Sequence, residues 1–483
     1  MQFNSTLTQQ RLLDPQAVAR LADAFHGQLI RPSDAGYDEA RAIWNGMIDR
    51  YPALVARCAD PRDVVIALNF ARTHDLPIAV RGGGHNVAGH ATVDNGLVID
   101  LSPMNAVTVD VEKRLARVGG GATCGDVDAA TQVYGLAAPG GVVSVTGVAG
   151  LTLGGGFGWL RNAYGLACDN LVAATVVLAD GRVVRASETE NADLLWGLRG
   201  GGGNFGIVTE FTFQLHPVGP EVMHVFAMKD ASGGKMAEAI RFFRDFSESA
   251  PDAITTLGAT GFIPPHAEVY PVEIHGKPFM LFGAMYAGPV EAGRRALQPL
   301  LDFGDTLADF SAVRPYVEAQ QMFNAEFPDG LRYYWKSLNV TRLDDAVIDV
   351  AVEHSLGMAS RLSTVDFWYV GGAVKRVGAD ASAFGGRQAG WLVNYEANWS
   401  DAADDPANVA WVKASVDALQ PFSDGSRYLN FAGFQEEGEA MMRSAFGGHY
   451  ARLAQLKAKY DPQNVFKLNQ NVQPAPQRPL HDN

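Results

Sequence analysis

The sequence predicts an α+β fold with a glycine-rich first part and a sheet-and-helix second part. Three glycine clusters occur before residue 210, and each lies beside a pattern of short alternating strands. Two close pairs of such strands are predicted hairpins. From about residue 220 the glycine clusters stop, and helical periodicities alternate with longer strands up to about residue 425. The second part therefore reads as an antiparallel sheet backed by helices.

The composition argues against several kinds of partner. Acidic residues outnumber basic ones by 53 to 39, and a net charge of −14 disfavours nucleic acid or an anionic membrane as a partner. The three cysteines are too few for a disulfide framework or a zinc site, and the eleven histidines are not spaced with acids as metal ligands. No signal peptide and no apolar run of roughly 18 residues is visible, so we expect a cytoplasmic protein.

The first glycine cluster follows a short strand. Residues 77–80 alternate in the manner of a strand and lead into Arg81-Gly82-Gly83-Gly84-His85-Asn86. Glycines accept positive φ and carry no side chain, so several N–H groups can converge on one anion. The pattern indicates a phosphate cradle. A helix precedes it, with Asp60 as N-cap and Pro61 at the first helical position.

Short elements connect the first two clusters and follow the second. We expect a strand at 97–101, a hairpin of 107–111 with 115–118, and a helix from Asp126 to Tyr134 closed by Gly135. A second hairpin turns at Asp180-Gly181.

The second and third clusters lie at 140–158 and 199–206. The third contains a formal G-x-G-x-x-G from Gly201 to Gly206. A dinucleotide site of the Rossmann type needs a helix directly after the glycines, because the helix N-terminus holds the pyrophosphate. Residues 207–213 read instead as a β-branched and aromatic strand, so the Rossmann interpretation fails.

The second part of the chain begins near Pro217, Gly219 and Pro220. We expect helices at 236–246, 405–419 and 450–459, strands at 279–286, 363–370 and 391–399, and a disordered tail after Pro474.

Five motifs in order resemble a known family. They are the glycine loop with His85, the Gly154 to Gly158 run with Tyr164-Gly165-Leu166 and Asp169-Asn170-Leu171, the segment 200–209, Tyr428-Leu429-Asn430, and Tyr460-Asp461-Pro462 to Asn471. Each motif alone is weak, but their order from about residue 40 to 472 is specific. The chain resembles the berberine bridge enzyme-like family, within the vanillyl-alcohol oxidase superfamily of FAD-linked oxidoreductases.

The resemblance implies a PCMH-type FAD-binding domain in two parts, residues 1–220 and 425–483, around a substrate domain at 221–424. In such proteins the first glycine loop binds the pyrophosphate, and the histidine at the position of His85 bonds covalently to the flavin ring. The resemblance implies the following cofactor contacts: Arg81, Gly82, Gly83, Gly84, His85, Asn86, His90, Gly140, Gly147, Gly150, Gly154, Gly158, Gly206, Ile207, Val208, Tyr428 and Asn430.

Two positions depart from the family pattern. Val143 lies where many relatives have a cysteine that makes a second flavin bond, and a valine cannot form a thioether. We therefore expect one covalent bond, through His85. Thr146 lies where relatives usually have an aliphatic residue that influences access of oxygen to the flavin.

The resemblance also implies catalytic residues. Oxidation of an alcohol or amine by a flavin needs a base for the O–H or N–H proton. Tyr428 matches the family's Tyr-x-Asn tyrosine, and Tyr164 matches one that often faces it across the substrate. A tyrosine base needs its pKa lowered by about 2 units from about 10, and Asn394 is the expected hydrogen-bonding neighbour. Glu396, two residues further on the same strand face, remains the alternative base.

The expected function is an FAD-dependent oxidase. It would take a hydride from an alcohol or amine carbon of a small molecule, such as a sugar or a secondary metabolite, and O2 would reoxidise the flavin to give H2O2. Oxidative ring closure on an alkaloid or polyketide, and a non-catalytic flavin-bearing protein that binds a ligand, remain alternatives. A nicotinamide-dependent reductase of the cell-wall type is disfavoured, because that group lacks the Tyr-x-Asn segment.

Overall fold

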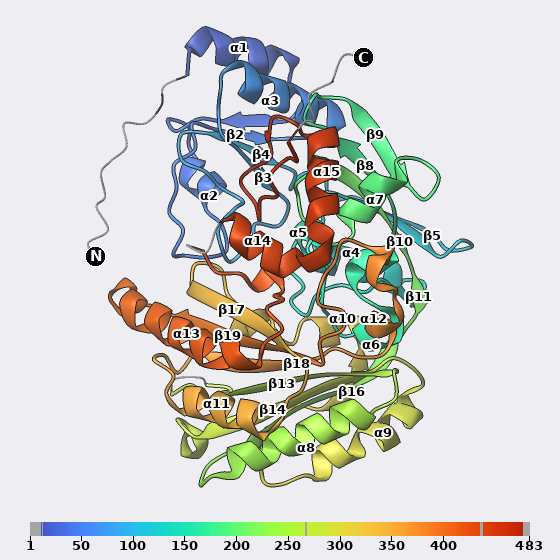
Figure 1. Ribbon diagram of the computed structural model, residues 1–483, viewed down its shortest axis with the longest axis vertical. Coiled ribbons are helices and arrows are strands. Elements are labelled where there is room, and N and C mark those ends of the chain that lie inside the picture. The colour runs from blue at the N-terminus through green and yellow to red at the C-terminus, as the bar shows by residue number, and fades with distance from the viewer. Residues whose placement is uncertain (1–10, 12, 266–267, 435–437, 477–483) are drawn as a thin grey trace.

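The chain folds into two halves that face each other. The computed structural model describes residues 11, 13–265, 268–434 and 438–476. Figure 1 shows one half with two small sheets above, and a second half with one large sheet and its helices below. The architecture is α+β, as predicted. None of the helices in these residues has the length and apolar character needed to cross a membrane.

The first sheet delivers the chain into the first glycine loop. Its strands lie in the order β1 (Gln28–Ile30), β2 (Leu54–Arg57), β4 (Leu97–Asp100) and β3 (Ile78–Arg81). Strands β2, β4 and β3 run parallel. Helices α1 (Pro15–Ala24) and α3 (Pro61–Thr73) pack on one face of the sheet. Because β3 ends at Arg81, the first glycine loop starts directly at the end of a strand of this sheet.

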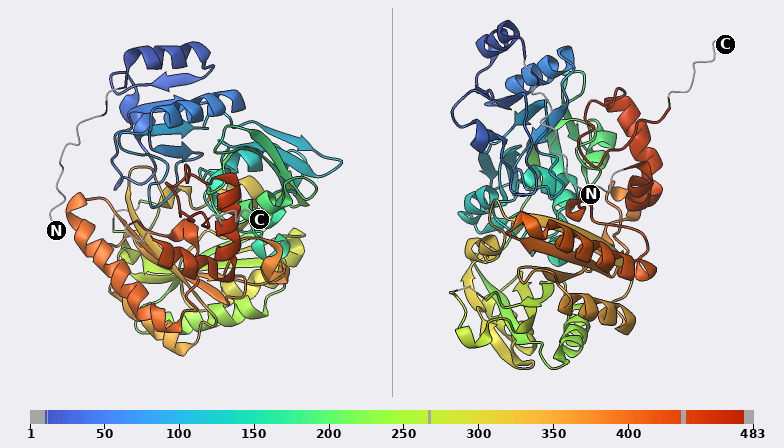
Figure 2. Two further views of the ribbon diagram at one scale, coloured as in Figure 1. Left: turned by 45° about the horizontal axis from the view of Figure 1, so that its top comes forward. Right: turned by 90° about the vertical axis from the view of Figure 1, so that its left-hand side faces the viewer.

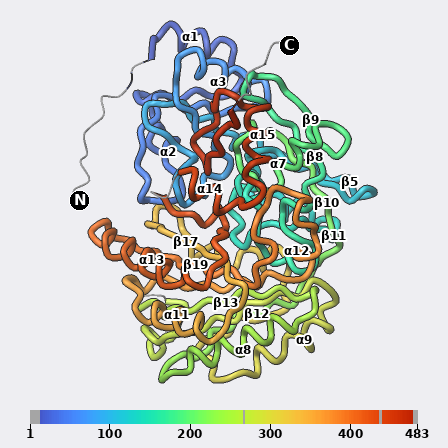
Figure 3. Tube along the Cα trace, in the orientation of Figure 1, coloured from blue at the N-terminus to red at the C-terminus, as the bar shows by residue number. Residues whose placement is uncertain are grey.

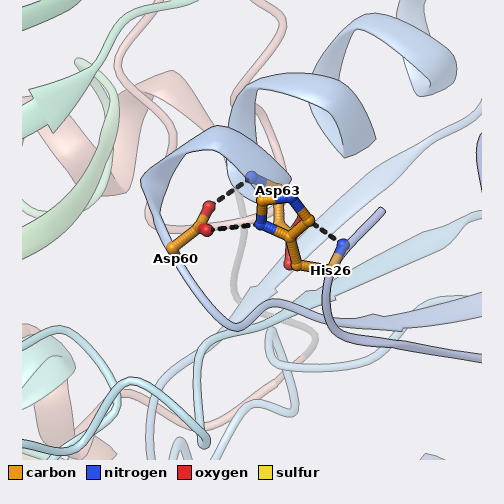
Figure 4. Close-up of side chains that lie close together, drawn as sticks. All are labelled: His26, Asp60 and Asp63. Carbon is orange, nitrogen blue, oxygen red and sulfur yellow. Dashed lines mark hydrogen bonds and ion pairs between the residues drawn. The ribbon is translucent and has the colours of Figure 1, made fainter. Parts of the chain in front are cut away.

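The start of helix α3 is fixed by a small polar cluster (Figure 4). The Asp60 side chain accepts from the Asp63 N–H, which confirms the predicted cap, and His26 Nδ1 lies 2.8 Å from the other Asp60 oxygen. The Asp63 carboxylate accepts from the N–H groups of His26 and Gly27 at 2.8 Å. This pairing of a histidine with acids cannot be read from local spacing, because 34 positions separate His26 from Asp60. These oxygens are engaged in hydrogen bonds, so the cluster ties the helix to residues 26–27.

The second sheet carries the third glycine cluster. Its strands, all antiparallel, lie in the order β5 (Val107–Asp110), β6 (Leu115–Gly119), β10 (Ile207–Gln214), β8 (Leu171–Val177) and β9 (Val183–Ser187). Both predicted hairpins are confirmed. Because β10 begins directly after Gly206, a strand and not a helix follows the glycines, and the rejection of a Rossmann site is confirmed.

The large sheet of the second half has two different faces. Helices α8 (Lys235–Ser249), α9 (Val290–Asp302), α11 (Asp345–Leu356) and α13 (Asp405–Leu419) cover the face that is turned away from the glycine loops (Figure 1). The strands are β15 (Thr306–Asp309), β12 (Glu221–Asp230), β14 (Pro278–Tyr286), β13 (Ile254–Phe262), β18 (Thr364–Tyr369), β19 (Trp391–Trp399) and β17 (Arg332–Val340), in that order, with β16 (Ala312–Pro315) on β12.

Alternation along the strands explains the two faces. On β14, Met280 and Phe282 pack with the helices, while Phe279 and Leu281 point to the other side. The sheet therefore offers an apolar surface to the glycine loops.

The chain returns to the first half at its end. Figures 2 and 3 show α14 (Glu439–Phe446) and α15 (Tyr450–Tyr460) beside the first half, where Leu453 packs with Trp196 and Phe205. Lys457 and Asp461 form a fully buried ion pair at 2.7 Å. The Lys457 ammonium also donates to the carbonyl oxygens of Asn204 and Phe466, at 2.8 and 2.9 Å. This ion pair thus ties the third glycine cluster to the end of the chain.

The remaining helices and strands are short. They are α2 (Tyr37–Arg41), α4 (Cys124–Gln132), β7 (Leu136–Ala137), α5 (Val148–Leu153), α6 (Arg161–Tyr164), α7 (Ala192–Leu198), β11 (His216–Pro217), α10 (Tyr316–Gln320) and α12 (Ala373–Arg376). The predicted helix at 126–134 begins two residues earlier, because the Thr123 and Asp126 side chains form a capping box. The predicted disordered tail lies mostly outside the described residues.

Replacing Lys457 should destabilise the protein strongly. In Lys457→Met the Asp461 carboxylate stays buried without its cation, and the free energy of unfolding should fall by about 3–5 kcal/mol. Lys459 on the same helix is the matched control, because its ion pair with Asp193 is solvent-exposed and Lys459→Met should cost less than about 1 kcal/mol. Denaturant unfolding of both variants measures the difference. Equal stability would show that the buried pair does not hold the C-terminal segment.

Candidate active site

A single cavity lies between the glycine loops and the inner face of the large sheet. The first half, the second half and the C-terminal segment all contribute to its wall. The predicted residues that line it are Gly82, Gly83, Gly84, His85, Asn86, His90, Gly147, Gly150, Gly154, Gly206, Ile207, Val208, Tyr428 and Asn430. Residues far apart in the sequence therefore meet at one site.

The glycine loops meet backbone to backbone. A Cβ atom on Gly83 would lie 2.5 Å from the Gly147 nitrogen, and one on Gly147 would lie 2.3 Å from the Gly83 nitrogen. No side chain larger than hydrogen fits at either position. The first and second clusters consequently form one continuous wall of bare backbone, which leaves room for a ligand to lie against N–H groups.

His85 lines the cavity as a neutral imidazole. Its ring stacks on Trp44 with centroids 4.6 Å apart, and Trp44 stacks in turn on Tyr333 at 3.7 Å. Burial lowers the pKa of His85 to about 4, and its buried Nε2 has no hydrogen-bond partner among the described residues. A neutral imidazole with a free nitrogen is the form that can act as a nucleophile.

Tyr428 and Asn430 hold the second glycine cluster. The Tyr428 hydroxyl oxygen accepts from the backbone N–H groups of Gly156 and Phe157, at 3.2 and 3.3 Å, and from Asn430 Nδ2 at 2.9 Å. Asn430 Nδ2 also donates to the Leu151 carbonyl oxygen. Burial nevertheless raises the pKa of Tyr428 to about 12, although these hydrogen bonds oppose the shift. The Tyr428 phenol is therefore protonated at neutral pH, and in that form it is a poor base.

Two buried carboxyl groups face the cavity from neighbouring strands. In the β18–β19 register Asp366 lies opposite Asn394, which brings its side chain to Glu396, and the two carboxyls share a hydrogen bond. Asn394 Nδ2 donates to Glu396 Oε1 at 2.6 Å, whereas Oε2 has no partner among the described residues. Burial raises the pKa of Asp366 to about 6, and burial together with the Asp366 charge raises that of Glu396 well above its usual value. The pair therefore shares one proton near neutral pH.

Five predicted site residues lie outside the cavity wall. The Arg81 guanidinium is buried behind the first loop and donates to the carbonyl oxygens of Ala40 and Ala91. Gly140 and Gly158 pack on each other, since a Cβ atom on Gly158 would lie 2.0 Å from the Gly140 oxygen. Asn394 is connected to the wall by the hydrogen bond that its Nδ2 donates to Glu396.

Tyr164 is the fifth predicted site residue that lies outside the cavity wall. Its ring stacks on His216 with centroids 4.0 Å apart, near Pro217. The geometry therefore gives no support to the expectation that Tyr164 faces Tyr428 across a substrate.

Sequence reasoning missed several residues of the wall. Trp44, Asp366 and Glu326 line the cavity, as do residues 468–470 of the C-terminal segment. The alternation of β18 puts Asp366 on the same face as Thr364 and Trp368, which was a usable signal, but the register with β19 was not readable. No sequence pattern distinguishes Trp44 or Glu326.

The wall fits a flavin dinucleotide. Bare glycine backbone can accept a diphosphate, and the apolar residues Val142, Val143, Ala149 and Leu151 beside it suit an aromatic ring system. The unpartnered nitrogen of His85 lies in the same wall. The residues present are thus those that FAD requires.

Comparisons with known proteins agree with this geometry. The family model described as FAD binding domain matches residues 52–187, and the one described as Berberine and berberine like matches residues 427–473. The chain is 31% identical to the uncharacterized FAD-linked oxidoreductase YgaK of Bacillus subtilis, over 93% of this chain and 97% of that protein. It is also 31% identical to (R)-6-hydroxynicotine oxidase of Paenarthrobacter nicotinovorans, with the same coverage.

Solved structures show the same fold. The crystal structure of 6-hydroxy-D-nicotine oxidase from Arthrobacter nicotinovorans has a TM-score of 0.82 at 30% identity, over 93% of this chain and 98% of that one. A chitooligosaccharide oxidase has a TM-score of 0.82 at 24% identity, over 95% and 100%. With the glycine wall and the C-terminal Tyr-x-Asn motif in place, the chain is an FAD-linked oxidoreductase and belongs to the berberine bridge enzyme-like family.

Proposed function

We propose that this protein is an FAD-dependent oxidase that acts on an alcohol or amine carbon of a small molecule. Residues 1–220 and 425–483 hold FAD, and residues 221–424 form the substrate side of the cavity. The observation that carries the proposal is the Asp366–Glu396 pair, which faces the glycine wall across one cavity. Bound FAD would supply the acceptor for a hydride from the substrate, and O2 would reoxidise it to give H2O2.

His85 is the single covalent anchor in this proposal. Its neutral ring, fixed by stacking on Trp44, leaves Nε2 unpartnered. Val143 lines the same wall and has no nucleophilic atom. The buried thiols of Cys124 and Cys168 do not line the cavity, and burial raises the pKa of both. No cysteine of the described residues lines the wall, and of its two histidines, His85 and His90, we assign the attachment to His85, whose buried Nε2 has no partner among the described residues.

The carboxyl pair is the proposed proton acceptor. Above about pH 6 the pair carries one negative charge, which can take the O–H or N–H proton as the substrate loses its hydride. Asn394 orients Glu396 through its 2.6 Å hydrogen bond. Because burial leaves Tyr428 protonated, we assign it the role of holding the glycine turn rather than that of base.

Attachment is tested by acid precipitation. In the parent protein the yellow colour should stay with the pellet, and in His85→Ala it should move to the supernatant, because His85 is the single covalent link in this proposal. Val143→Ala is the control and should retain the colour in the pellet. Retention of colour in the His85→Ala pellet would disprove this anchor.

Replacing Glu396 should slow flavin reduction. In Glu396→Gln the pair loses one of the two carboxyls that share its proton and charge, and the rate of anaerobic flavin reduction by a substrate should fall about 100-fold or more, the range that a positioned proton acceptor contributes. Glu353→Gln, on the exposed side of helix α11, is the control and should leave the rate unchanged. A normal rate in Glu396→Gln would place the base elsewhere.

The same reaction should depend on pH in one direction. A base works when ionised, and burial raises the pKa of Asp366 from its usual 3.8 to about 6. The rate should therefore be full above that value and be lost as the pH falls through about 6. Stopped-flow measurement between about pH 4.5 and 8 records the profile. A rate that stays constant down to about pH 4.5 would contradict the buried pair.

Tyr428→Phe should affect binding more than proton transfer. Three N–H donors lose their acceptor, so the protein should lose about 2 kcal/mol or more of stability and retain less FAD. For the FAD that remains bound, the rate of flavin reduction should keep the same midpoint in its pH profile. A shift of that midpoint would return Tyr428 to the role of base.

A further inference from the structure

The substrate side of the cavity is mostly apolar. Six residues of three neighbouring strands line it in alternation, and all are hydrocarbon or thioether side chains: Phe226 and Met228 on β12, Leu257 and Ala259 on β13, and Phe279 and Leu281 on β14. Phe323, Phe327 and Trp368 extend the same surface. Such a wall desolvates the body of a bound molecule and offers its atoms few polar partners.

The charged groups of the cavity wall are carboxyls. Within the described parts of the chain, Glu326, Asp366 and Glu396 line it, and no lysine or arginine does. Burial holds the two histidines, His85 and His90, neutral by lowering the pKa of each to about 4. The charged side chains of the wall are therefore acidic, and the substrate side is lined mostly by apolar groups.

The polar groups nearest the carboxyl pair are already paired. Trp335 Nε1 donates to Asn398 Oδ1 at 2.7 Å, and Asn398 Nδ2 donates to the Leu362 carbonyl oxygen. Of the polar side chains on this side of the wall, that leaves Thr364, the three carboxyls and the Trp368 indole, whose buried Nε1 has no partner among the described residues. A sugar ring needs a partner for each buried hydroxyl, and these groups are too few for a whole ring.

Glu326 stands at the side of the cavity with aromatic neighbours. Phe323 and Phe327, before and after it in the chain, have ring centroids 6.4 Å apart, and Phe323 also packs near Phe226 at 5.3 Å. Glu326 is an exposed residue at the cavity wall and forms no ion pair with any residue that the structure describes. The protein around it raises the pKa of its carboxyl by desolvation, so a cation brought beside it would stabilise the charged form.

We propose that the substrate is an amphiphilic amine: a protonated nitrogen that Glu326 and the flanking aromatic rings attract, attached to an apolar or aromatic body that fills the sheet face. This rests on the proposed function of the same site and narrows it from alcohols and amines to hydrophobic amines, with oligosaccharides excluded. Charge pairing and cation–π attraction act together at Glu326.

The carboxyl pair can take the proton that an amine must lose before its oxidation. A protonated amine has no lone pair on nitrogen, and removal of a hydride from the neighbouring carbon requires one. Transfer of the N–H proton to the ionised carboxyl of the Asp366–Glu396 pair supplies it, and both residues line the cavity. Glu326 is thus a residue for attraction and specificity, and the pair is the proton acceptor.

The test measures binding to the FAD-loaded protein. The probes are N-methylbenzylamine, which is a cation at pH 7, its neutral isostere benzyl methyl ether, and the sugar cellobiose, with Kd from calorimetry under anaerobic conditions. The amine should bind at least about fivefold more tightly than the ether, and cellobiose should not bind. Glu326→Gln should weaken the amine about fivefold and leave the ether unchanged. Glu318→Gln, an exposed change of equal charge outside the cavity, should alter neither.

Equal Kd values for amine and ether, no binding of the amine, binding of cellobiose, or an unchanged amine Kd in Glu326→Gln would each overturn the inference. The visible spectrum of the same samples separates this from failure of the proposed function. Amines that bind without bleaching the flavin would refute the oxidase and leave the binding preference intact. Bleaching by neutral sugars would keep the oxidase and refute the amine.

Discussion

The structure depends on the contact between two stretches of bare backbone. Gly83 and Gly147 approach so closely that a Cβ atom on either would overlap the main chain of the other. Because the first follows strand β3 and the second precedes helix α5, this contact fixes the first loop against the second. The same principle acts at Gly158 and Gly140. The result is a wall whose donors are main-chain N–H groups, the arrangement that a diphosphate requires.

The end of the chain holds this wall in place. Asn430 and Tyr428 bind the main chain between Leu151 and Phe157, and the ion pair of Lys457 with Asp461 binds the third cluster at Asn204. The tyrosine and the asparagine of the Tyr-x-Asn motif therefore have a structural role, which is to form hydrogen bonds with these main-chain groups. It also has a chemical consequence, since a tyrosine used and buried in this way keeps its proton. In the proposed function, the proton is therefore accepted by the carboxyls of Asp366 and Glu396.

Much of the fold was predictable, because local signals were strong. Helix α13 has the predicted bounds, 405–419, since Pro406 marks its start and apolar periodicity its length. The strand after Gly206 was predicted from its alternating β-branched and aromatic residues. The arrangement of the active site was harder to predict from the sequence. Asp366 reaches Glu396 only through the register of β18 on β19, and Tyr164 is turned toward His216 by packing that no motif encodes. Both depend on tertiary contacts, which a linear pattern does not contain.

In the proposed function, the glycine wall and the sheet face enclose one flavin per chain. The visible absorption spectrum of the purified protein, recorded before and after unfolding in denaturant, tests this most directly. The account predicts a flavin spectrum in a ratio of one per chain, perturbed in the folded protein and relaxed on unfolding. A chain that is colourless when purified, and remains so after incubation with FAD, would contradict it.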